Sequence, residues 1–177
     1  MKNIAFLGIG AMSQRIATNL INAEYQLHIW NRTPQKCQSL IEKGAIAYNS
    51  PYEAVRLADV AIAMITDNRA SAEVWLNKTT GAIHALKPDT IVIESSTLTP
   101  TWCRELGKQI SKHNCNFLDA PVVGSRPQAK SKQLTYLVGG QRNIVRRVKE
   151  IVTYSYADST NTDVGFSPIP AIASDTR

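Results

Sequence analysis

The fold is decided by the stretch IAFLGIGAMS, residues 4–13, and by its place between two apolar runs. Four apolar residues run directly into Gly8 and Gly10, and a helical pattern begins immediately afterwards. Gly8 permits a tight turn, and Gly10 lets the backbone approach a ligand closely. The amides and the positive dipole at the start of a helix attract phosphate charge. With a second apolar run at 25–30, this order of strand, glycine turn, helix and strand predicts a dinucleotide-binding unit.

Strand and helix patterns alternate along most of the chain. The strands are predicted at 2–8, 25–30, 60–65, 90–93, 116–118 and 134–138, and the helices at 11–23, 34–43, 51–57, 70–76, 100–112 and 141–152. The continuous apolar run at 60–65 is typical of a strand that is buried on both faces. The pattern predicts an α/β fold of the Rossmann type, a doubly wound, mostly parallel sheet with helices on both faces.

The domain organisation is indicated by the point at which this alternation stops. We expect residues 1–152 to form one NAD(P)-binding domain, and residues 153–177 to be an irregular tail rather than a domain. The tail is rich in Ser, Thr, Asp, Ala and Pro and shows little periodicity, which is typical of a segment outside the core.

Composition narrows the class of protein. The 177 residues carry a formal net charge of +6, and the densest cations, Arg142, Arg146, Arg147 and Lys149, fall at near-helical spacing. That spacing predicts a solvated helix face and no nucleic-acid partner. No apolar run approaches the roughly 20 residues of a membrane helix, so we expect no membrane partner and a cytoplasmic protein. Three cysteines and three scattered histidines predict reduced thiols and no metal site.

The cofactor preference is indicated by the end of the second predicted strand, which reads Asn31-Arg32-Thr33. An NAD-selective site usually places a carboxylate there, where it accepts hydrogen bonds from the ribose hydroxyls. This chain has no carboxylate at that point. Arg32 instead offers a forked, permanently charged partner for a 2′-phosphate. The pattern therefore favours NADP over NAD, against the alternative of an ordinary surface arginine.

Two later loops carry polar groups that could serve a site. The hydroxyls of ESSTLTP, residues 94–100, could bond a cofactor or substrate, although capping of the next helix is the favoured interpretation from the residues alone. The turn Gly124-Ser125 offers backbone amides to a carboxylate. No arrangement of residues for nucleophilic catalysis stands out.

Taken in order, these blocks resemble the β-hydroxyacid dehydrogenase family, which includes 3-hydroxyisobutyrate dehydrogenases, tartronate semialdehyde reductases and glyoxylate reductases. The matching motifs are FLGIGAM (6–12), WNRT (30–33), STLTP (96–100), FLDAPV (117–122) and LTYLVGG (134–140). The resemblance covers about residues 1–150 and implies an oxidoreductase that moves a hydride between NADP(H) and a small hydroxyacid or semialdehyde.

The resemblance also implies roles for individual residues. The implied cofactor-binding residues are Gly8, Ile9, Gly10, Ala11 and Met12 at the pyrophosphate, Asn31, Arg32 and Thr33 at the adenosine ribose, and Met64, Ile65, Thr66 and Thr97 towards the nicotinamide. The implied substrate-binding residues are Ser96, Val123, Gly124 and Ser125.

Four departures from the family pattern qualify this assignment. Ser13 stands where the third glycine is usual, and Val123 stands where the family usually has a serine. The family's catalytic lysine lies on a helix just beyond the cofactor domain, but this chain has no lysine after Lys149. The family's all-helical C-terminal domain, which often also forms a homo-oligomer in full-length members, is missing. We therefore expect no catalytic residue here and little or no turnover.

Two other interpretations stay open. The chain could be a non-catalytic NADP-binding fragment or module, or it could be related to the imine reductases. Imine reductases share the first two motifs and match the third and fourth less well.

Overall fold

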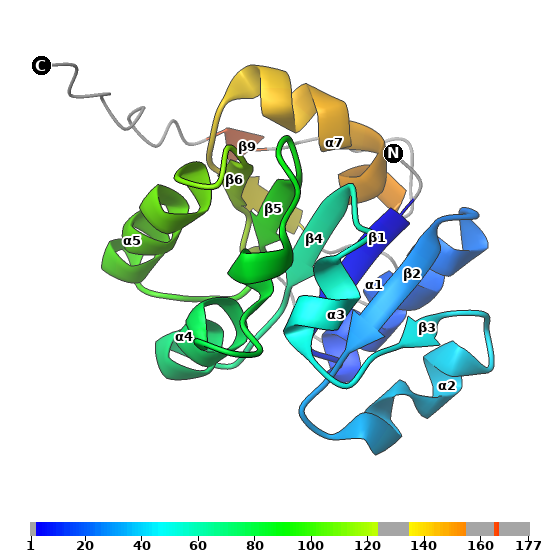
Figure 1. Ribbon diagram of the computed structural model, residues 1–177. Helices are drawn as coiled ribbons and strands as arrows, with labels where there is room; N and C mark the ends of the chain where they lie inside the picture. The colour runs from blue at the N-terminus through cyan, green and yellow to red at the C-terminus, as the bar shows by residue number, and fades with distance from the viewer. Residues whose placement is uncertain (1–2, 124–134, 155–164, 167–177) are drawn as a thin grey trace, which may run out of the picture.

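The computed structural model describes residues 3–123, 135–154 and 165–166. Its main sheet contains β1 (Asn3–Leu7), β2 (Gln26–Trp30), β3 (Ile46–Ala47), β4 (Val60–Ala63), β5 (Ile91–Glu94) and β6 (Asn116–Asp119). All neighbouring pairs are parallel, in the order β3-β2-β1-β4-β5-β6. The α-helices are α1 (Ala11–Asn22), α2 (Gln38–Ile41), α3 (Pro51–Val55), α4 (Asn68–Leu76), α5 (Pro100–Ser111) and α7 (Arg142–Tyr154). The predicted doubly wound Rossmann-type sheet is confirmed (Figure 1).

The sheet separates two apolar cores because successive residues of a strand point to opposite faces. Ile4 and Phe6 of β1 belong to the core that α1 and α7 cover, whereas Ala5 and Leu7 belong to the core beneath α3, α4 and α5. All four side chains are completely buried. A strand buried on both faces must be apolar at every position, which is why the central strands read as continuous apolar runs.

Three of the predicted helices are preceded by a Ser or Thr followed by Pro, which is typical of a capped helix start, and two of the three form side-chain caps. Ser50 Oγ accepts from the amide of Glu53 at 3.2 Å before Pro51, and Thr99 Oγ1 accepts from the amide of Trp102 at 3.4 Å. Thr33 makes no such bond, and the helix predicted over 34–43 is instead a 3₁₀ helix, η1 (Pro34–Cys37), followed by the short α2. Residues 64–65, predicted to end a strand, lie in a loop after β4.

Three short elements escape the sequence prediction. They are β3, the 3₁₀ helix η2 (Ala82–Ala85), and β7 (Val122–Val123), which pairs antiparallel with β8 (Thr135–Val138). A further two-residue strand, β9 (Gly165–Phe166), lies within the predicted tail and pairs with β8. Runs of two to four residues are too short to show a hydrophobic period.

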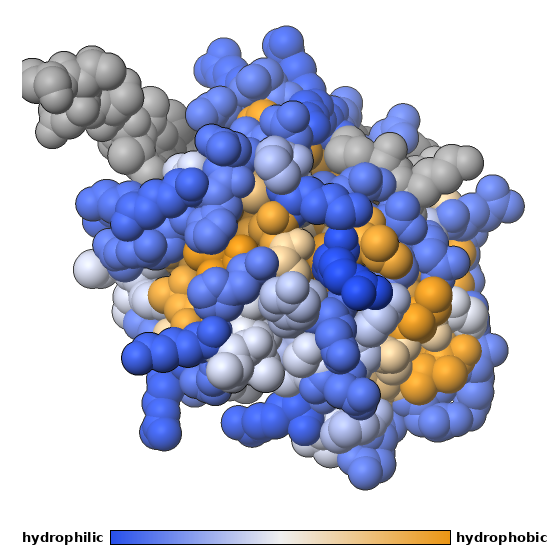
Figure 2. Space-filling model, viewed as in Figure 1, coloured by the Kyte–Doolittle hydropathy of each residue, from blue (hydrophilic) through white to orange (hydrophobic). Residues whose placement is uncertain are grey.

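The surface agrees with the charge pattern. Arg142, Arg146, Arg147 and Lys149 are all exposed on α7, while Val148 and Ile151 on its other side are buried. Hydrophilic residues cover most of the face shown in Figure 2, and apolar ones emerge beside the β3 edge, where Ile41 and Ile46 are exposed. No helix within the described ranges combines the length and apolarity that crossing a membrane would require.

Gly8 lets the turn after β1 lie close against the loop after β4. It follows β1 with a φ of +91°, and a Cβ placed on it would lie 2.5 Å from the Met64 carbonyl oxygen. The same Cβ would lie 2.7 Å from Ile65 Cδ1. Any side chain at this position therefore meets both an unfavourable backbone conformation and a backbone atom that cannot rotate away.

We expect Gly8→Ala to lower the free energy of unfolding by about 1–3 kcal/mol more than Gly44→Ala does, because overpacking is added to backbone strain. Gly44 is the matched control, since its φ is also positive (+99°) but no atom lies within 4 Å of a Cβ placed on it. Urea unfolding of both variants measures the difference. Equal losses would contradict the close approach at Gly8.

The three cysteine thiols are buried. The pKa of the Cys103 thiol is raised the most. Burial, followed by the negative charges of Asp119 and Glu94, raises the pKa of Cys103 to about 12. As pH rises, the unfolded chain therefore releases this proton first, so the thiol's contribution to stability is lost between its ordinary pKa of 9.0 and about 12.

We expect the free energy of unfolding to fall across this alkaline range, with up to about 1.4 kcal/mol per pH unit attributable to Cys103. Urea unfolding at several pH values, for the native chain and Cys103→Ala, measures the two slopes. The variant starts less stable because of the cavity, but its slope is shallower. Parallel curves would show that Cys103 does not titrate in this way.

Candidate functional site

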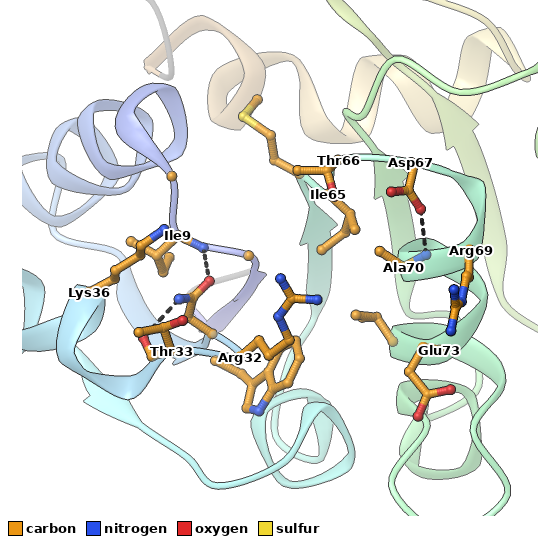
Figure 3. Close-up of a pocket in the computed structure, with 16 residues that line it drawn as sticks. Ile9, Arg32, Thr33, Lys36, Ile65, Thr66, Asp67, Arg69, Ala70 and Glu73 are labelled. Atoms are coloured by element: carbon orange, nitrogen blue, oxygen red, sulfur yellow. Dashed lines mark hydrogen bonds between the residues drawn. The ribbon is translucent and has the colours of Figure 1, made fainter.

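A cleft of about 600 Å³ opens at the carboxyl ends of β1, β2 and β4. This is where the strand order reverses, the position at which parallel α/β sheets bind ligands. The glycine turn, the residues after β2, the loop after β4 and the first turns of α4 line it (Figure 3). The lining residues are Gly8, Ile9, Gly10, Trp30, Asn31, Arg32, Thr33, Lys36, Met64, Ile65, Thr66, Asp67, Arg69, Ala70, Glu73 and Val74.

The glycine turn is held by hydrogen bonds within the protein. The Gly8 amide donates to the Trp30 carbonyl at 2.9 Å, and the Ile9 amide donates to Asn31 Oδ1 at 2.8 Å. The Gly10 amide donates to Ser13 Oγ at 2.5 Å. The amides of Ala11 and Met12 belong to the first turn of α1, where the helix itself provides no acceptor. Both amides are therefore donors that the turn can offer to an anion.

Ser13, which replaces the third glycine of the motif, has a structural role that the sequence did not reveal. Its side chain is 1% exposed, and its hydroxyl also donates to the Gly10 carbonyl at 3.2 Å. The hydroxyl closes the turn on itself, so a side chain is accommodated where the motif usually has none.

Of the residues after β2, Asn31 holds the glycine turn, whereas Arg32 and Lys36 present their side chains to the cleft. Asn31 uses its side-chain carbonyl to accept from Ile9 and donates its amide hydrogen to the Thr33 carbonyl at 2.8 Å. Arg32 is exposed and extends into the cleft between the glycine turn and α4 (Figure 3). Lys36, on η1, also lines the cleft and was not predicted. Its signal was available as a second cation four residues after Arg32.

The α4 side of the cleft carries charges of both signs. Asp67 caps the helix, with Oδ1 accepting from the Ala70 amide at 2.8 Å. Arg69 and Glu73 follow on the exposed side of the helix. The cleft therefore has its positive side chains on both walls, at Arg32, Lys36 and Arg69, and its acids only on α4.

A buried carboxylate lies behind this wall. Glu94 ends β5, is completely buried, and accepts hydrogen bonds from Ser71, Trp75 and Ser96. Burial raises the pKa of Glu94, and the hydrogen bonds from Ser96, Trp75 and Ser71 act in the opposite direction. Ser96 was predicted as a site residue but Glu94 was not, because an acidic residue after three apolar ones gave no sign of being buried.

The predicted site residues further along the chain do not all line the cleft. Met64, Ile65 and Thr66 join the glycine turn in the cleft, whereas Thr97 is exposed in the loop after β5 and is not among the lining residues. Ser96 is 2% exposed, and its hydroxyl bonds to the Ile65 amide and Glu94. Val123 is 51% exposed on β7. Gly124 and Ser125 lie outside the described residues.

In the described part of the chain, no three His, Cys, Asp or Glu side chains come together as a metal site would need.

His28 is buried on β2, and its ring lies within hydrogen-bonding distance of Tyr48 Oη, at 2.9 Å. Burial lowers the pKa of His28. This environment favours a neutral histidine with a structural role.

Comparisons with known proteins agree with the site. Residues 3–162 match the family model of the NAD binding domain of 6-phosphogluconate dehydrogenase. The chain is 35% identical over 151 residues to a mitochondrial 3-hydroxyisobutyrate dehydrogenase of Drosophila melanogaster, covering 85% of this chain and 46% of that protein. It is 33% identical to an NAD-dependent L-serine dehydrogenase of Pseudomonas aeruginosa, covering 85% and 50%.

Among solved structures, the 3-hydroxyisobutyrate dehydrogenase of Mycobacterium tuberculosis with L-serine aligns with a TM-score of 0.82 at 29% identity. That alignment covers 88% of this chain and 52% of the other. The chain thus spans about half the length of each of these three dehydrogenases. With the strand order and the glycine cleft, the match over residues 3–162 establishes that this chain belongs to the family of the NAD binding domain of 6-phosphogluconate dehydrogenase.

Proposed function

We propose that this chain is the NADP(H)-binding half of an oxidoreductase acting on a small hydroxyacid or semialdehyde. The observation that carries the choice of NADP(H) is Arg32, which reaches into the cleft just after β2. NAD-selective sites place a carboxylate at this point, and here Asn31 has its carbonyl engaged with Ile9 instead. A guanidinium is a strong partner for the 2′-phosphate that distinguishes NADP from NAD.

The residues present fit a dinucleotide. The absence of a Cβ at Gly8 keeps the floor of the cleft open, and the amides of Ala11 and Met12 remain to donate to a phosphate. Arg32 and Lys36 lie on one wall as partners for the 2′-phosphate. Met64 to Thr66 form the opposite end, where the resemblance puts the nicotinamide. Thr97 is assigned to that end from the resemblance alone.

The reaction class comes from the relatives, whose names include 3-hydroxyisobutyrate dehydrogenase and L-serine dehydrogenase. In the oxidising direction, the carbinol carbon gives a hydride to NADP⁺ and its hydroxyl gives a proton to a base, which yields a carbonyl compound and NADPH. The resemblance assigns that proton to a lysine beyond the cofactor domain, and the substrate carboxylate to Gly124 and Ser125 beside Ser96 and Val123.

A second candidate is a cofactor-binding module without catalysis. These 177 residues hold no lysine after Lys149, so the polypeptide by itself lacks the proton donor that the resemblance assigns. Both candidates require the cleft to bind a dinucleotide, and they differ only in turnover.

We expect the chain to bind NADPH at least about tenfold more tightly than NADH, because charge-assisted hydrogen bonds to the 2′-phosphate contribute about 1.5–3 kcal/mol. Trp30 lines the cleft, so quenching of tryptophan fluorescence reports binding. In Arg32→Ala, we expect weaker NADPH binding, which removes most of the preference. The Kd for NADH stays within about threefold of that of the native chain. Lys36→Ala has a smaller effect of the same kind.

Lys43→Ala is the matched control, since Lys43 is exposed and does not line the cleft. It loses the same charge and should leave both affinities unchanged. Tighter binding of NADH than of NADPH by the native chain would contradict the role given to Arg32.

We expect the 177-residue polypeptide by itself to show no NADPH-dependent reduction of small semialdehydes above a protein-free blank. The physical reason is the missing proton donor, without which the developing alkoxide is not neutralised. A full-length 3-hydroxyisobutyrate dehydrogenase, assayed in parallel, shows that the assay detects turnover. Measurable reduction by the polypeptide would overturn this expectation and exclude the purely binding module.

A further inference from the structure

Glu94 is a buried carboxylate with an unusual set of partners. It accepts four hydrogen bonds, two on each oxygen. Oε2 accepts from Ser71 Oγ at 3.2 Å and Trp75 Nε1 at 2.9 Å, and Oε1 accepts from the amide and the hydroxyl of Ser96. All four donors are neutral groups, so no cation among them accounts for the presence of an acid here. Four donors match the capacity of an ionised carboxylate.

The two hydroxyls in this set have their directions fixed from outside. Ser96 Oγ accepts from the Ile65 amide at 2.6 Å, and Ser71 Oγ accepts from Trp102 Nε1 at 3.0 Å. Amide and indole nitrogens can only donate. Each hydroxyl must therefore direct its single hydrogen to Glu94, and the carboxylate is the end point of two donor chains.

One of these chains ends in the wall of the cleft. Ile65 follows β4, lines the cleft, and is the residue whose Cδ1 closes over Gly8. Its loop is anchored by the Met64 amide on the Leu7 carbonyl at 2.9 Å, by the Ile65 amide on Ser96, and by the Asp67 cap. Of these three anchors, the hydrogen bond from the Ile65 amide to Ser96 is the one that depends on Glu94.

We propose that Glu94 is a positioning residue that holds the loop of residues 64–67 against the glycine turn, by directing the Ser96 hydroxyl so that it accepts from the Ile65 amide. This rests on the proposed function, in that the loop is taken to form one wall of the cofactor site. Ser96 then serves the site through the position of Ile65 rather than through contact with substrate.

Two acceptor oxygens, and not only the shape of the Glu94 side chain, are needed for this role. Glutamine has nearly the same shape, but it presents one oxygen and one NH₂ group. Oε2 faces an indole N–H of Trp75, and Oε1 faces the backbone N–H of Ser96. Neither donor can reverse its direction, so either orientation of a glutamine leaves two donors facing each other.

The test uses Glu94→Gln and Ser96→Ala, with Ser71→Ala as a variant that cuts the other donor chain. Glu105→Gln is the matched control, because Glu105 is exposed on α5 and its carboxylate bonds only to Gln109 among the contacts described. The first readout, made without cofactor, is amide hydrogen exchange of Ile65 by NMR, compared with Ala63 on β4. Indole N–H resonances of Trp75 and Trp102 report on the network itself.

In Glu94→Gln and Ser96→Ala, we expect the Ile65 amide to exchange about tenfold faster or more while Ala63 stays protected, since local opening is separable from global unfolding. The Kd for NADPH rises about 3–10-fold, as for one lost hydrogen bond. Ser71→Ala shifts the Trp102 indole resonance and leaves Ile65 exchange and the Kd within about twofold. Combining Glu94→Gln with Ser96→Ala adds little to either single change, because both act on one chain of contacts.

Unchanged exchange of the Ile65 amide in both Ser96→Ala and Glu94→Gln would overturn the proposal. Equally faster exchange of the Ala63 amide would also overturn it, because that result would mean general destabilisation. Faster Ile65 exchange with an unaltered Kd would overturn the link to the cofactor site. If Glu94→Gln does not fold, Ser96→Ala decides alone, since it removes only a hydroxyl. If the native chain binds neither NADPH nor NADH, the proposed function fails, whereas the exchange data still decide whether Glu94 holds the loop.

Discussion

The approach of Gly8 to the loop after β4 is the constraint on which the rest of the structure depends. The backbone passes so close to the Met64 carbonyl that a Cβ would lie 2.5 Å from it. At that contact the chain leaves β1 for α1, and the strand order reverses between β1 and β4. The floor of the cleft, the direction of α1 and the position of Ile65 are all set there. A ligand can approach the amides of α1 only because no side chain fills this point.

The hydrogen bonds around the cleft fix its shape from within the protein. Asn31 and Ser13 each accept from an amide of the glycine turn, and Ser96 accepts from the amide of Ile65. Donors that point inwards are thus paired within the protein, and those of Ala11 and Met12 are left for an anion. A buried polar group without a partner costs about 1–3 kcal/mol, so these pairings favour one arrangement of three loops.

The sequence predicted the sheet better than it predicted the roles of the polar residues. Apolar runs such as 60–63 identified central strands, because a strand buried on both faces leaves a strong signal. The β3 edge strand left none, since it has only Ile46 and Ala47 and both are exposed. Thr33 followed by Pro34 looked like a cap, but η1 forms there without a side-chain cap.

The cleft residues show the same division between local and long-range information. The glycines and Arg32 could be placed from spacing alone, because the turn and the strand end are local features. Glu94 could not, because its donors Ser71 and Trp75 come from α4, and only the packing of α4 against β5 brings them to the carboxylate. Lys36 was visible in the sequence, but the 3₁₀ turn that carries it to the cleft was predicted as an α-helix.

The two ends of the cleft differ in how firmly they are tied to the fold. Residues 8–13, Asn31 and Ile65 are joined by short hydrogen bonds and close packing, so a change there disturbs the sheet itself. Arg32, Thr33 and Lys36 are exposed, and the sheet does not depend on their side chains. Substitutions at exposed positions of this kind change the free energy of unfolding by about 0.5 kcal/mol or less. Substitutions at these positions can therefore change which cofactor the cleft prefers without disturbing the sheet that holds the glycine turn.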